Sequence, residues 1–259
     1  MDFGLTGKRA VVLGASRGLG AGIAAALATE GVDVLAAART TAADADSNAA
    51  PGSGGRITTH RLDLANPEQV AEFAEMLRRE GNTDILVNNC GGPKPGPARG
   101  QSASAWSSSF AEMASPMFAI TEAVLKGMTE RGWGRIITIG SSGIVQPIPN
   151  LALSNGVRGA IAGWSKTLAT EVAPHGVTVN MILPGRIDTD RVRSLDAAAA
   201  ERMGTTVEAA VEASRASIPA GRYGTPEEFG AMAAFLASRQ AAYITGSMIL
   251  VDGGMVRGI

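Results

Sequence analysis

The octapeptide Leu13–Gly20, "LGASRGLG", follows the short apolar run "AVVL" (10–13) and carries glycines at positions 14, 18 and 20. A segment with helical spacing begins at Gly18. Glycine lets the backbone turn sharply and approach a ligand closely, and the start of a helix offers unpaired N–H groups and a positive dipole end. The stretch therefore predicts a strand, a tight turn and a helix that together bind a pyrophosphate.

The rest of the chain repeats this alternation of short apolar runs with longer amphipathic segments. In chain order the runs are "AVVLG" (10–14), "VDVLAAA" (32–38), "ITTHRLDL" (57–64), "DILVNN" (84–89), "GRIITIG" (134–140), "GVTVNMILPG" (176–185) and "SMILVDGG" (247–254). Nearly continuous apolar runs are typical of parallel strands buried on both faces. The pattern predicts one α/β domain over 1–259, a doubly wound Rossmann fold with helices on both faces of a parallel sheet. The polar, Gly-rich segment 42–55 is predicted to be a surface loop without a chemical role.

Composition narrows the choice of partners. The 259 residues are 45% hydrophobic and 18% charged, and their formal charge of -1 gives no reason to expect nucleic acid or an anionic membrane as partner. The single cysteine, Cys90, excludes an internal disulfide and fits a reducing compartment. The two histidines, His60 and His175, are too scattered for a metal site. We expect a cytoplasmic protein that binds a small-molecule substrate, has no metal and does not span a membrane.

Several motifs together resemble the short-chain dehydrogenase/reductase family, in particular a divergent branch similar to 3-oxoacyl-acyl-carrier-protein reductases. The glycine spacing matches T-G-x-x-x-G-x-G with Leu13 in place of threonine, and "RLDL", "NNCG", "LPGRIDT" and "VDGG" follow in the family's order. The resemblance covers essentially the whole chain and implies a nicotinamide dinucleotide cofactor. Carried over position by position, the cofactor-binding residues are Gly14, Ser16, Arg17, Gly18, Leu19, Gly20, Arg39, Asp63, Leu64, Asn89, Gly91, Arg158, Pro184, Gly185, Ile187 and Thr189.

The end of the second predicted strand decides which dinucleotide is expected. An acidic residue there would hold a ribose 2′-hydroxyl, whereas this strand ends with Ala38 followed by Arg39. Arg17, inside the glycine turn, resembles the basic residue that NADP-using members place beside the 2′-phosphate. Two guanidinium groups and no acid favour NADP(H) over NAD(H). The alternative is that both arginines are ordinary solvated surface residues.

The family's catalytic tyrosine and lysine are the positions at which this chain departs from the resemblance. Ser141 stands at the catalytic serine, with Ser142 as a one-residue alternative. Counting back from "SKTLATEV", the Y-x-x-x-K positions hold Ser154 and Arg158, and the asparagine position holds Met113. A serine hydroxyl lacks the acidity of a phenol near neutral pH, and arginine keeps its charge but does not pass on a proton.

Each of these positions also has a plainer interpretation. Ser154 is either part of a proton route or a small residue that leaves room for a ligand. Arg158, on an otherwise apolar helix, needs a partner because a buried cation is costly. Cys90 is predicted to be a small buried residue beside the cofactor rather than a nucleophile. Neither tyrosine, Tyr223 or Tyr243, is an evident replacement acid.

Three functions follow from these observations. The favoured one is an NADP(H)-dependent oxidoreductase with a non-standard proton route, with Ser141, Ser154 and Arg158 as the catalytic set. The others are a dinucleotide-binding regulatory protein and a non-redox enzyme that uses the same pocket. The Ala-rich segment 188–220 resembles the family's mobile substrate lid. The resemblance implies a homo-oligomer, a tetramer or a dimer, because long helices of the family pair across a two-fold axis, and "AIAGWSKTLATEV" (160–172) keeps an apolar, small-residue face suited to such contact.

Overall fold

The computed structural model describes residues 2–40 and 54–258. Seven strands form one parallel sheet in the order β3-β2-β1-β4-β5-β6-β7. Their bounds are β1 Arg9–Leu13, β2 Asp33–Ala38, β3 Ile57–Arg61, β4 Ile85–Asn88, β5 Gly134–Ile139, β6 Val177–Pro184 and β7 Met248–Val251. All seven predicted strands and the parallel sheet are confirmed. Of the predicted surface loop 42–55, only Gly54 and Gly55 lie within the described residues.

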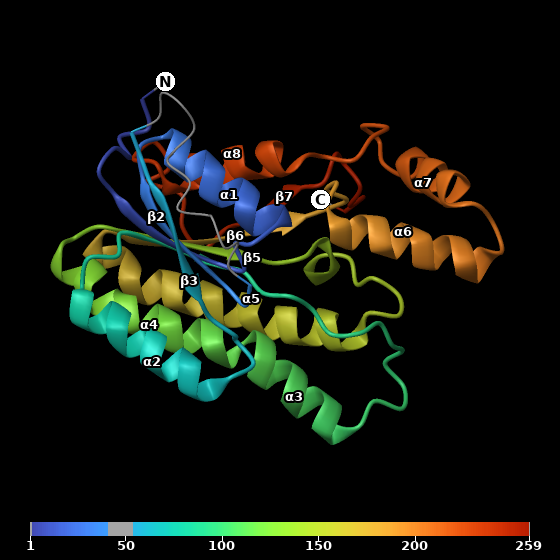
Figure 1. Cartoon of the computed structure of the whole chain (residues 1–259), viewed down its shortest axis with the longest axis horizontal. Coiled ribbons are helices and arrows are strands. Elements are labelled where there is room, and N and C mark those ends of the chain that lie inside the picture. The colour runs from blue at the N-terminus through green and yellow to red at the C-terminus, as the bar shows by residue number, and fades with distance from the viewer. Residues whose placement is uncertain (1, 41–53, 259) are drawn as a thin grey trace.

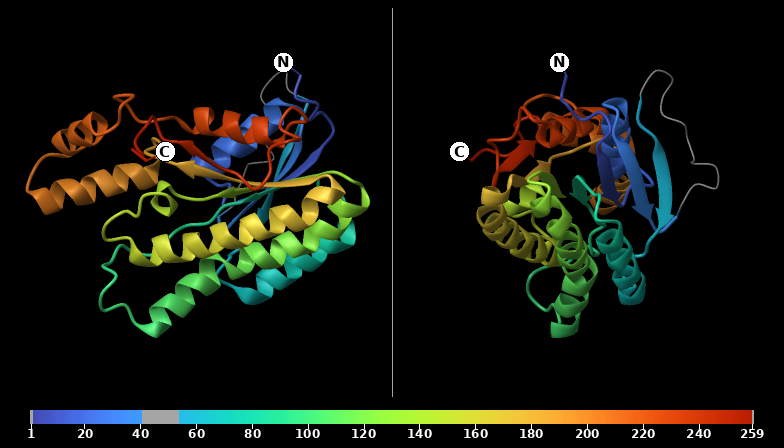
Figure 2. Two further views of the ribbon diagram at one scale, coloured as in Figure 1. Left: turned by 180° about the vertical axis from the view of Figure 1, so that it is seen from behind. Right: turned by 90° about the vertical axis from the view of Figure 1, so that its left-hand side faces the viewer.

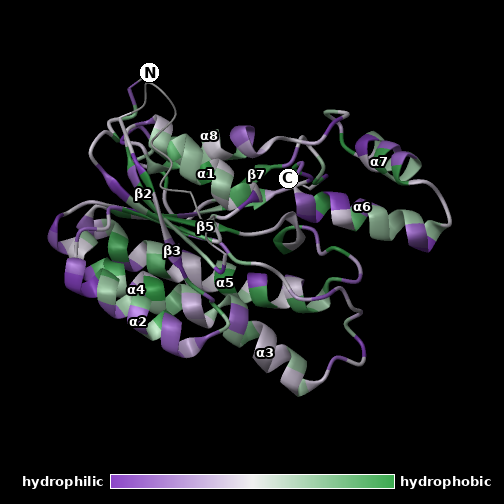
Figure 3. Cartoon of the chain, in the orientation of Figure 1, coloured by the Kyte–Doolittle hydropathy of each residue, from purple (hydrophilic) through white to green (hydrophobic). Residues whose placement is uncertain are grey.

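Helices cover both faces of the sheet, as Figures 1 and 2 show. One layer contains α1 (Gly18–Thr29) and α8 (Pro226–Ala237), and the other contains α2 (Pro67–Glu80), α4 (Ser115–Glu130) and α5 (Ala152–Val172). The central strands are buried from both sides; the side chains of β4, for example, are entirely buried. This accounts for their continuous apolar sequences, which Figure 3 shows as green ribbons with purple segments gathered on the helices around them.

Helix α2 illustrates how local sequence fixes an element. Asn66 caps it by accepting hydrogen bonds from the backbone N–H groups of Glu68 and Gln69, at 3.0 and 3.1 Å. Pro67 occupies its first turn, where the missing N–H costs nothing. The helix ends at Gly81, whose φ of 62° is the left-handed conformation that glycine adopts freely. Between these signals the side chains that face the sheet recur at helical spacing.

The order of the strands creates a crevice at one edge of the sheet. From β1 the chain continues to β2 and β3 on one side, and then crosses back to β4, β5, β6 and β7 on the other. The loops that follow β1 and β4 therefore separate at their carboxyl ends, which is where ligands bind in open α/β sheets. Beyond this edge lie α3 (Ala103–Met113) and the pair α6 (Asp190–Met203) and α7 (Val207–Ala216), the latter pair at the right of Figure 1.

Candidate active site

A cleft of about 1820 Å³ opens at the carboxyl edge of the strands. The glycine-rich turn, the ends of β2, β4, β5 and β6, and the starts of α5 and α6 contribute to its walls. Pro93 and Pro95 also line it, so the Pro/Gly loop after β4 (91–97) lies on the cleft side of the sheet. The loop is fastened to the segment before α5 by a 2.7 Å hydrogen bond from the Gly96 N–H to the Asn150 carbonyl oxygen.

The glycine-rich turn has the close backbone packing that a dinucleotide site requires. Gly14 and Gly18 adopt φ values of 62° and 59°. A Cβ atom on Gly14 would lie 2.7 Å from Nδ2 of Asn89, and one on Gly20 would lie 2.3 Å from the Gly14 carbonyl oxygen. The Asn89 amide donates to the carbonyl oxygens of Leu13 and Gly14, at 3.2 and 3.3 Å, and so ties the end of β4 to the turn. Helix α1 begins here without a side-chain cap, so its first N–H groups stay available to an anion.

The same end of the cleft as the glycine-rich turn carries the two arginines that the sequence assigns to a phosphate. Arg17 and Arg39 are exposed and line the cleft together with Ala38. Arg17 lies 3.7 Å from a carboxylate oxygen of Asp190, in a pair whose side chains are 74% and 58% exposed. Such an exposed pair contributes little and leaves the guanidinium free to change partner. Asp63 and Leu64 line the same end, where the Asp63 carboxylate accepts a 3.0 Å hydrogen bond from the Ala65 N–H.

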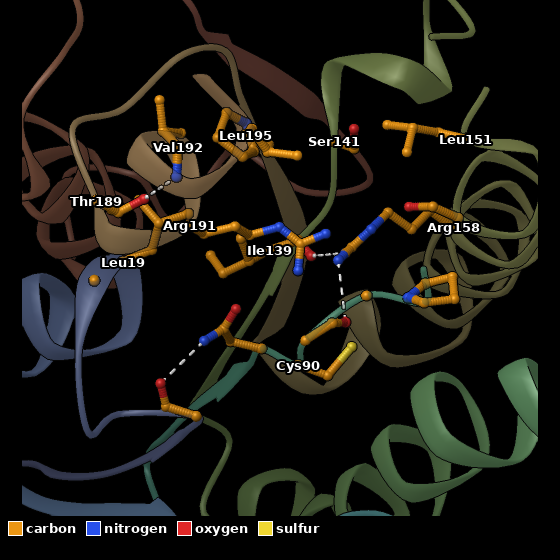
Figure 4. A pocket seen from close by; sticks show the side chains of 18 of the residues that line it. Leu19, Cys90, Ile139, Ser141, Leu151, Arg158, Thr189, Arg191, Val192 and Leu195 are labelled. Atoms are coloured by element: carbon orange, nitrogen blue, oxygen red, sulfur yellow. Dashed lines mark hydrogen bonds between the residues drawn. The ribbon is translucent and has the colours of Figure 1, made fainter. Parts of the chain in front are cut away.

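Ser141 and Ser154 line the other half of the cleft. Ser141, labelled in Figure 4, follows β5. Its Oγ accepts a 3.0 Å hydrogen bond from the Gly143 N–H, which leaves its own O–H free to donate. Ser142, the alternative at this position, also lines the cleft but is 3% exposed. Ser154 and Arg158 lie one turn apart on the cleft side of α5, and both are buried.

Arg158 is a buried cation held by backbone carbonyls. It donates to the Ile139 carbonyl oxygen at 3.0 Å and to the Gly91 carbonyl oxygen at 3.5 Å (Figure 4). Among the residues that the structure describes, no carboxylate pairs with it. Burial lowers the pKa of its guanidinium, and the nearby positive charge of Arg191 lowers it further. A guanidinium still stays charged at any ordinary pH, so the cleft holds a fixed positive charge here.

The remaining positions singled out in the sequence place no phenol in the described lining of the cleft. Met113, which the sequence analysis assigns to the family's asparagine position, is 3% exposed and lines the cleft. Tyr223 lies outside the cleft lining and donates a 2.8 Å hydrogen bond to Asp196, and Tyr243 is fully exposed. Cys90 lies at the cleft floor, where burial raises the pKa of its thiol and keeps it protonated.

All but one of the site residues carried over from sequence are brought together in this cleft. The exception is Gly20, which lies beneath the glycine turn and allows it to pack. The sequence analysis missed Arg191 and Glu112, which also line the cleft. The sequence could have pointed to Arg191, because a basic residue in the first turn of a helix opposes the helix dipole and is therefore unusual there. In residues 2–40 and 54–258 no cluster of metal-ligating side chains occurs, and no described helix is long and apolar enough to cross a bilayer.

Comparisons with known proteins agree with this geometry. A family profile described as enoyl-(acyl carrier protein) reductase matches residues 14–256. The chain is 36% identical over 254 residues to the 3-oxoacyl-acyl-carrier-protein reductase FabG of Vibrio cholerae, covering 97% of this chain and 98% of the relative. It is 34% identical over 256 residues to a D-beta-hydroxybutyrate dehydrogenase of Cupriavidus necator, covering 97% and 99%. The crystal structure of L-sorbose reductase from Gluconobacter frateurii with NADPH and L-sorbose superposes with a TM-score of 0.92 at 31% identity, covering all of both chains.

Proposed function

Because this chain belongs to the short-chain dehydrogenase/reductase family, we propose that it is an NADP(H)-dependent oxidoreductase that interconverts a small carbonyl compound and its alcohol. The observation that carries the proposal is the single cleft, in which a glycine-rich turn and two arginines lie at one end and Ser141, Ser154 and Arg158 at the other. The first group suits a dinucleotide phosphate, and the second suits the oxygen of a reacting carbonyl.

The chain's own residues suit the cofactor at each part of the cleft. The N–H groups at the start of α1 would take the pyrophosphate, beside a turn whose tight packing leaves no room for a Cβ at Gly14 or Gly20. Arg17 and Arg39 would take the 2′-phosphate, and Asp63 and Leu64 the adenine. Arg158 has five N–H donors, of which two are bound to carbonyl oxygens, so others remain for ribose hydroxyls.

The proposed proton route does not use a phenol. When bound, NADPH supplies a hydride to the carbonyl carbon. The hydroxyls of Ser141 and Ser154 hold the carbonyl oxygen by donating hydrogen bonds, and the charge of Arg158 stabilises the oxyanion as it forms. The proton then comes from a bound water, from the substrate itself or through the two serines. Positioning and exclusion of water supply much of the rate when no strong acid is present.

The relatives differ in the substrates that their names specify, so the family alone does not fix the substrate of this chain. Their names specify a 3-oxoacyl carrier protein, D-beta-hydroxybutyrate and L-sorbose. We propose that residues 188–220, which contain α6 and α7, form a lid over the substrate end of the cleft. We also propose that the protein is a cytoplasmic homo-oligomer.

Cofactor preference is the first test of this function. NADPH is expected to bind about tenfold or more tightly than NADH, because two guanidinium groups are available to the 2′-phosphate and no acid is available to the 2′-hydroxyl. Calorimetry measures both dissociation constants. The double variant Arg17→Ala with Arg39→Ala should remove the preference, whereas Arg78→Ala, an exposed arginine on α2, should keep it. Equal affinities in the unaltered protein would contradict the assignment.

Turnover is the second test. NADPH that carries deuterium at the transferred position should deliver the label to a carbon of the product, as read by mass spectrometry. A reaction without loss of nicotinamide absorbance would instead identify a non-redox enzyme.

A second function, dinucleotide binding without turnover, is supported by the tyrosines. The chain has two, and neither lines the cleft. NADPH binding with no label transfer to any carbonyl compound would favour this binding-protein function over the oxidoreductase.

A further inference from the structure

Two arginine side chains meet in the cleft beside Cys90. Arg158 reaches in from α5, and Arg191 reaches across from the first turn of α6, so that the two side chains point toward one another (Figure 4). Each is close enough to the Cys90 thiol to lower its pKa, although burial outweighs them and raises it. Two like charges that face each other repel, and the repulsion is greater where solvent is scarce. Such an arrangement is stabilised when an anion lies between the two guanidinium groups.

Neither arginine has a carboxylate partner in 2–40 and 54–258. Arg158 is held by two backbone carbonyls, and Arg191 forms no ion pair or hydrogen bond with any described residue. Arginines nearby behave differently. Arg193 pairs with Asp188 and Asp190. Arg186 pairs with the buried Asp196.

The position of Arg191 is unfavourable for α6 itself. It stands in the first turn of the helix, where the dipole favours acidic residues and disfavours a cation. Its guanidinium lies over Gly92, where a Cβ atom would be 2.9 Å from an Arg191 terminal nitrogen. The Pro/Gly loop after β4 therefore leaves room for this side chain. Arg191 opposes the dipole of its own helix, and Gly92 leaves space for its guanidinium. We therefore expect a bound ligand to be its partner.

The acids of the cleft do not fill that role. Among the residues that the structure describes, three carboxyl-bearing ones line it, namely Asp63, Glu112 and Asp190. Asp190 is bound to Arg193 and Arg17, and Asp63 caps the turn at the adenine end. Glu112 forms no ion pair with either arginine. The positive charge at this corner is therefore available to a bound molecule.

We propose that Arg158 and Arg191 form the binding site for the carboxylate of an oxo-acid or hydroxy-acid substrate. The inference rests on the proposed function and adds the substrate class to it. Two guanidinium forks match the geometry of a carboxylate, which accepts from both. Ser154 precedes Arg158 by one helical turn, a rise of about 6 Å, so the reacting oxygen and the carboxylate are only a few bonds apart. The site fits a short acid whose carbonyl lies two to four carbons along the chain.

The competing source of the anion is the pyrophosphate of the cofactor. The open N–H groups of α1 already provide for a pyrophosphate at the glycine turn, whereas Arg158 lies beside Ser154 at the other end of the cleft. We therefore assign the anion between the two arginines to the substrate, while Arg158 keeps a further donor for the cofactor ribose, and the experiment separates the two sources of the anion.

The experiment measures binding to the NADP⁺ complex, in which a carbonyl compound is not reduced. Calorimetry compares 2-, 3- and 4-oxopentanoate with their methyl esters, which have the same carbonyl and no charge. At least one acid should bind about tenfold or more tightly than its ester. Arg191→Gln should remove that difference, Arg191→Lys should retain part of it, and Arg193→Gln, on the same helix, should leave it unchanged. Arg191 is exposed to the open cleft, so these variants are expected to fold.

Three results would overturn the inference. The first is that no acid binds more tightly than its ester. The second is that Arg191→Gln leaves the acid preference intact. The third is that Arg191→Gln weakens NADP⁺ binding tenfold while the acid-to-ester ratio stays the same, which would assign the arginine to the cofactor. Failure of the proposed function has a different readout: NADP⁺ does not bind, or no label is transferred. In that case the acid-to-ester ratio can still be measured on the cofactor-free protein.

Discussion

Ser154 and Arg158 share one face of α5 but differ in what they can contribute. The serine is buried, and its hydroxyl has no acidity near neutral pH. The arginine is buried with a permanent charge, which two backbone carbonyls only partly offset. If the pair stands at the family's tyrosine and lysine positions, as we propose, it supplies a positive charge there but no group that donates a proton near neutral pH.

Single replacements should separate these two contributions. Arg158→Ala is expected to weaken NADP(H) binding by about 1.5 to 3 kcal/mol, because it removes a charged donor for the ribose. Ser154→Ala, one turn away on the same face, should leave cofactor affinity almost unchanged. Calorimetric dissociation constants measure both, with thermal unfolding as the check that each variant folds. If Arg158→Ala folds and binds NADPH as tightly as the unaltered protein, the ribose assignment is wrong.

A double replacement should restore the missing acid. Ser154→Tyr with Arg158→Lys supplies a phenol whose pKa a nearby ammonium lowers, and general acid–base assistance contributes about a hundredfold to ten-thousandfold. We expect faster reduction of simple activated ketones than in the unaltered protein, followed by NADPH consumption. Met113 still occupies the family's asparagine position, so recovery should be partial. A double variant that folds, binds NADPH and reduces nothing would favour the binding-protein function.

Helix α6 is anchored by a buried carboxylate. Asp196, 2% exposed, accepts a 3.0 Å hydrogen bond from Arg186 in the loop after β6 and a 2.8 Å hydrogen bond from the Tyr223 hydroxyl. These contacts join α6 to the loop after β6 and to the segment before α8. The lid that we propose would need a fixed base, and this network would provide one.

Breaking this anchor should loosen the proposed lid before it unfolds the protein. Asp196→Ala leaves Arg186 and Tyr223 without their partner and is expected to lower the free energy of unfolding by about 2 kcal/mol, a value reduced because Arg186 is partly exposed. Tyr223→Phe removes one hydrogen bond and should cost about 1 kcal/mol. Chemical denaturation measures both, and limited proteolysis should show faster cleavage within 188–220 in the alanine variant. Unchanged cleavage would mean that other contacts hold α6.

Helix α5 has an outer face made of small residues. Gly159, Ala160 and Gly163 are exposed, and a Cβ atom on either glycine would meet nothing within 4 Å. Small exposed residues one turn apart allow another helix to approach closely. The same helix carries Ser154 and Arg158 on its other side, so contact between copies would also stabilise the cleft.

We therefore expect a dimer or a tetramer of the 26.4 kDa chain. Light scattering at micromolar concentration should give two or four times that mass. Gly163→Glu places a charge on the contact face and should lower the measured mass, whereas Thr129→Glu, on α4 at its exposed end, serves as control. A single-chain mass for the unaltered protein would contradict the prediction.

Much of this protein could be predicted from local sequence. The seven apolar runs, the cap at Asn66, and the glycines at 14 and 18 specify strands, helix ends and a tight turn through interactions between residues that are close in the chain. The family motifs then pointed to candidate site residues, and all of these but Gly20 line the cleft. Gly20 differs because it is required for packing within the turn: a Cβ atom at this position would clash with the Gly14 carbonyl oxygen.

The order of elements, the parallel sheet and the residues at its carboxyl edge follow from periodicity and turn chemistry, which are local properties of the chain. Which charges have partners depends instead on how distant segments pack. Arg158 and Arg191 are 33 positions apart in the sequence. Their guanidinium groups face each other because α5 and α6 lie on opposite sides of the cleft. Burial, the absence of a carboxylate among the described neighbours and the space over Gly92 arise from packing between distant segments. A linear pattern does not specify such contacts, since the energy of a charge depends on what surrounds it in space.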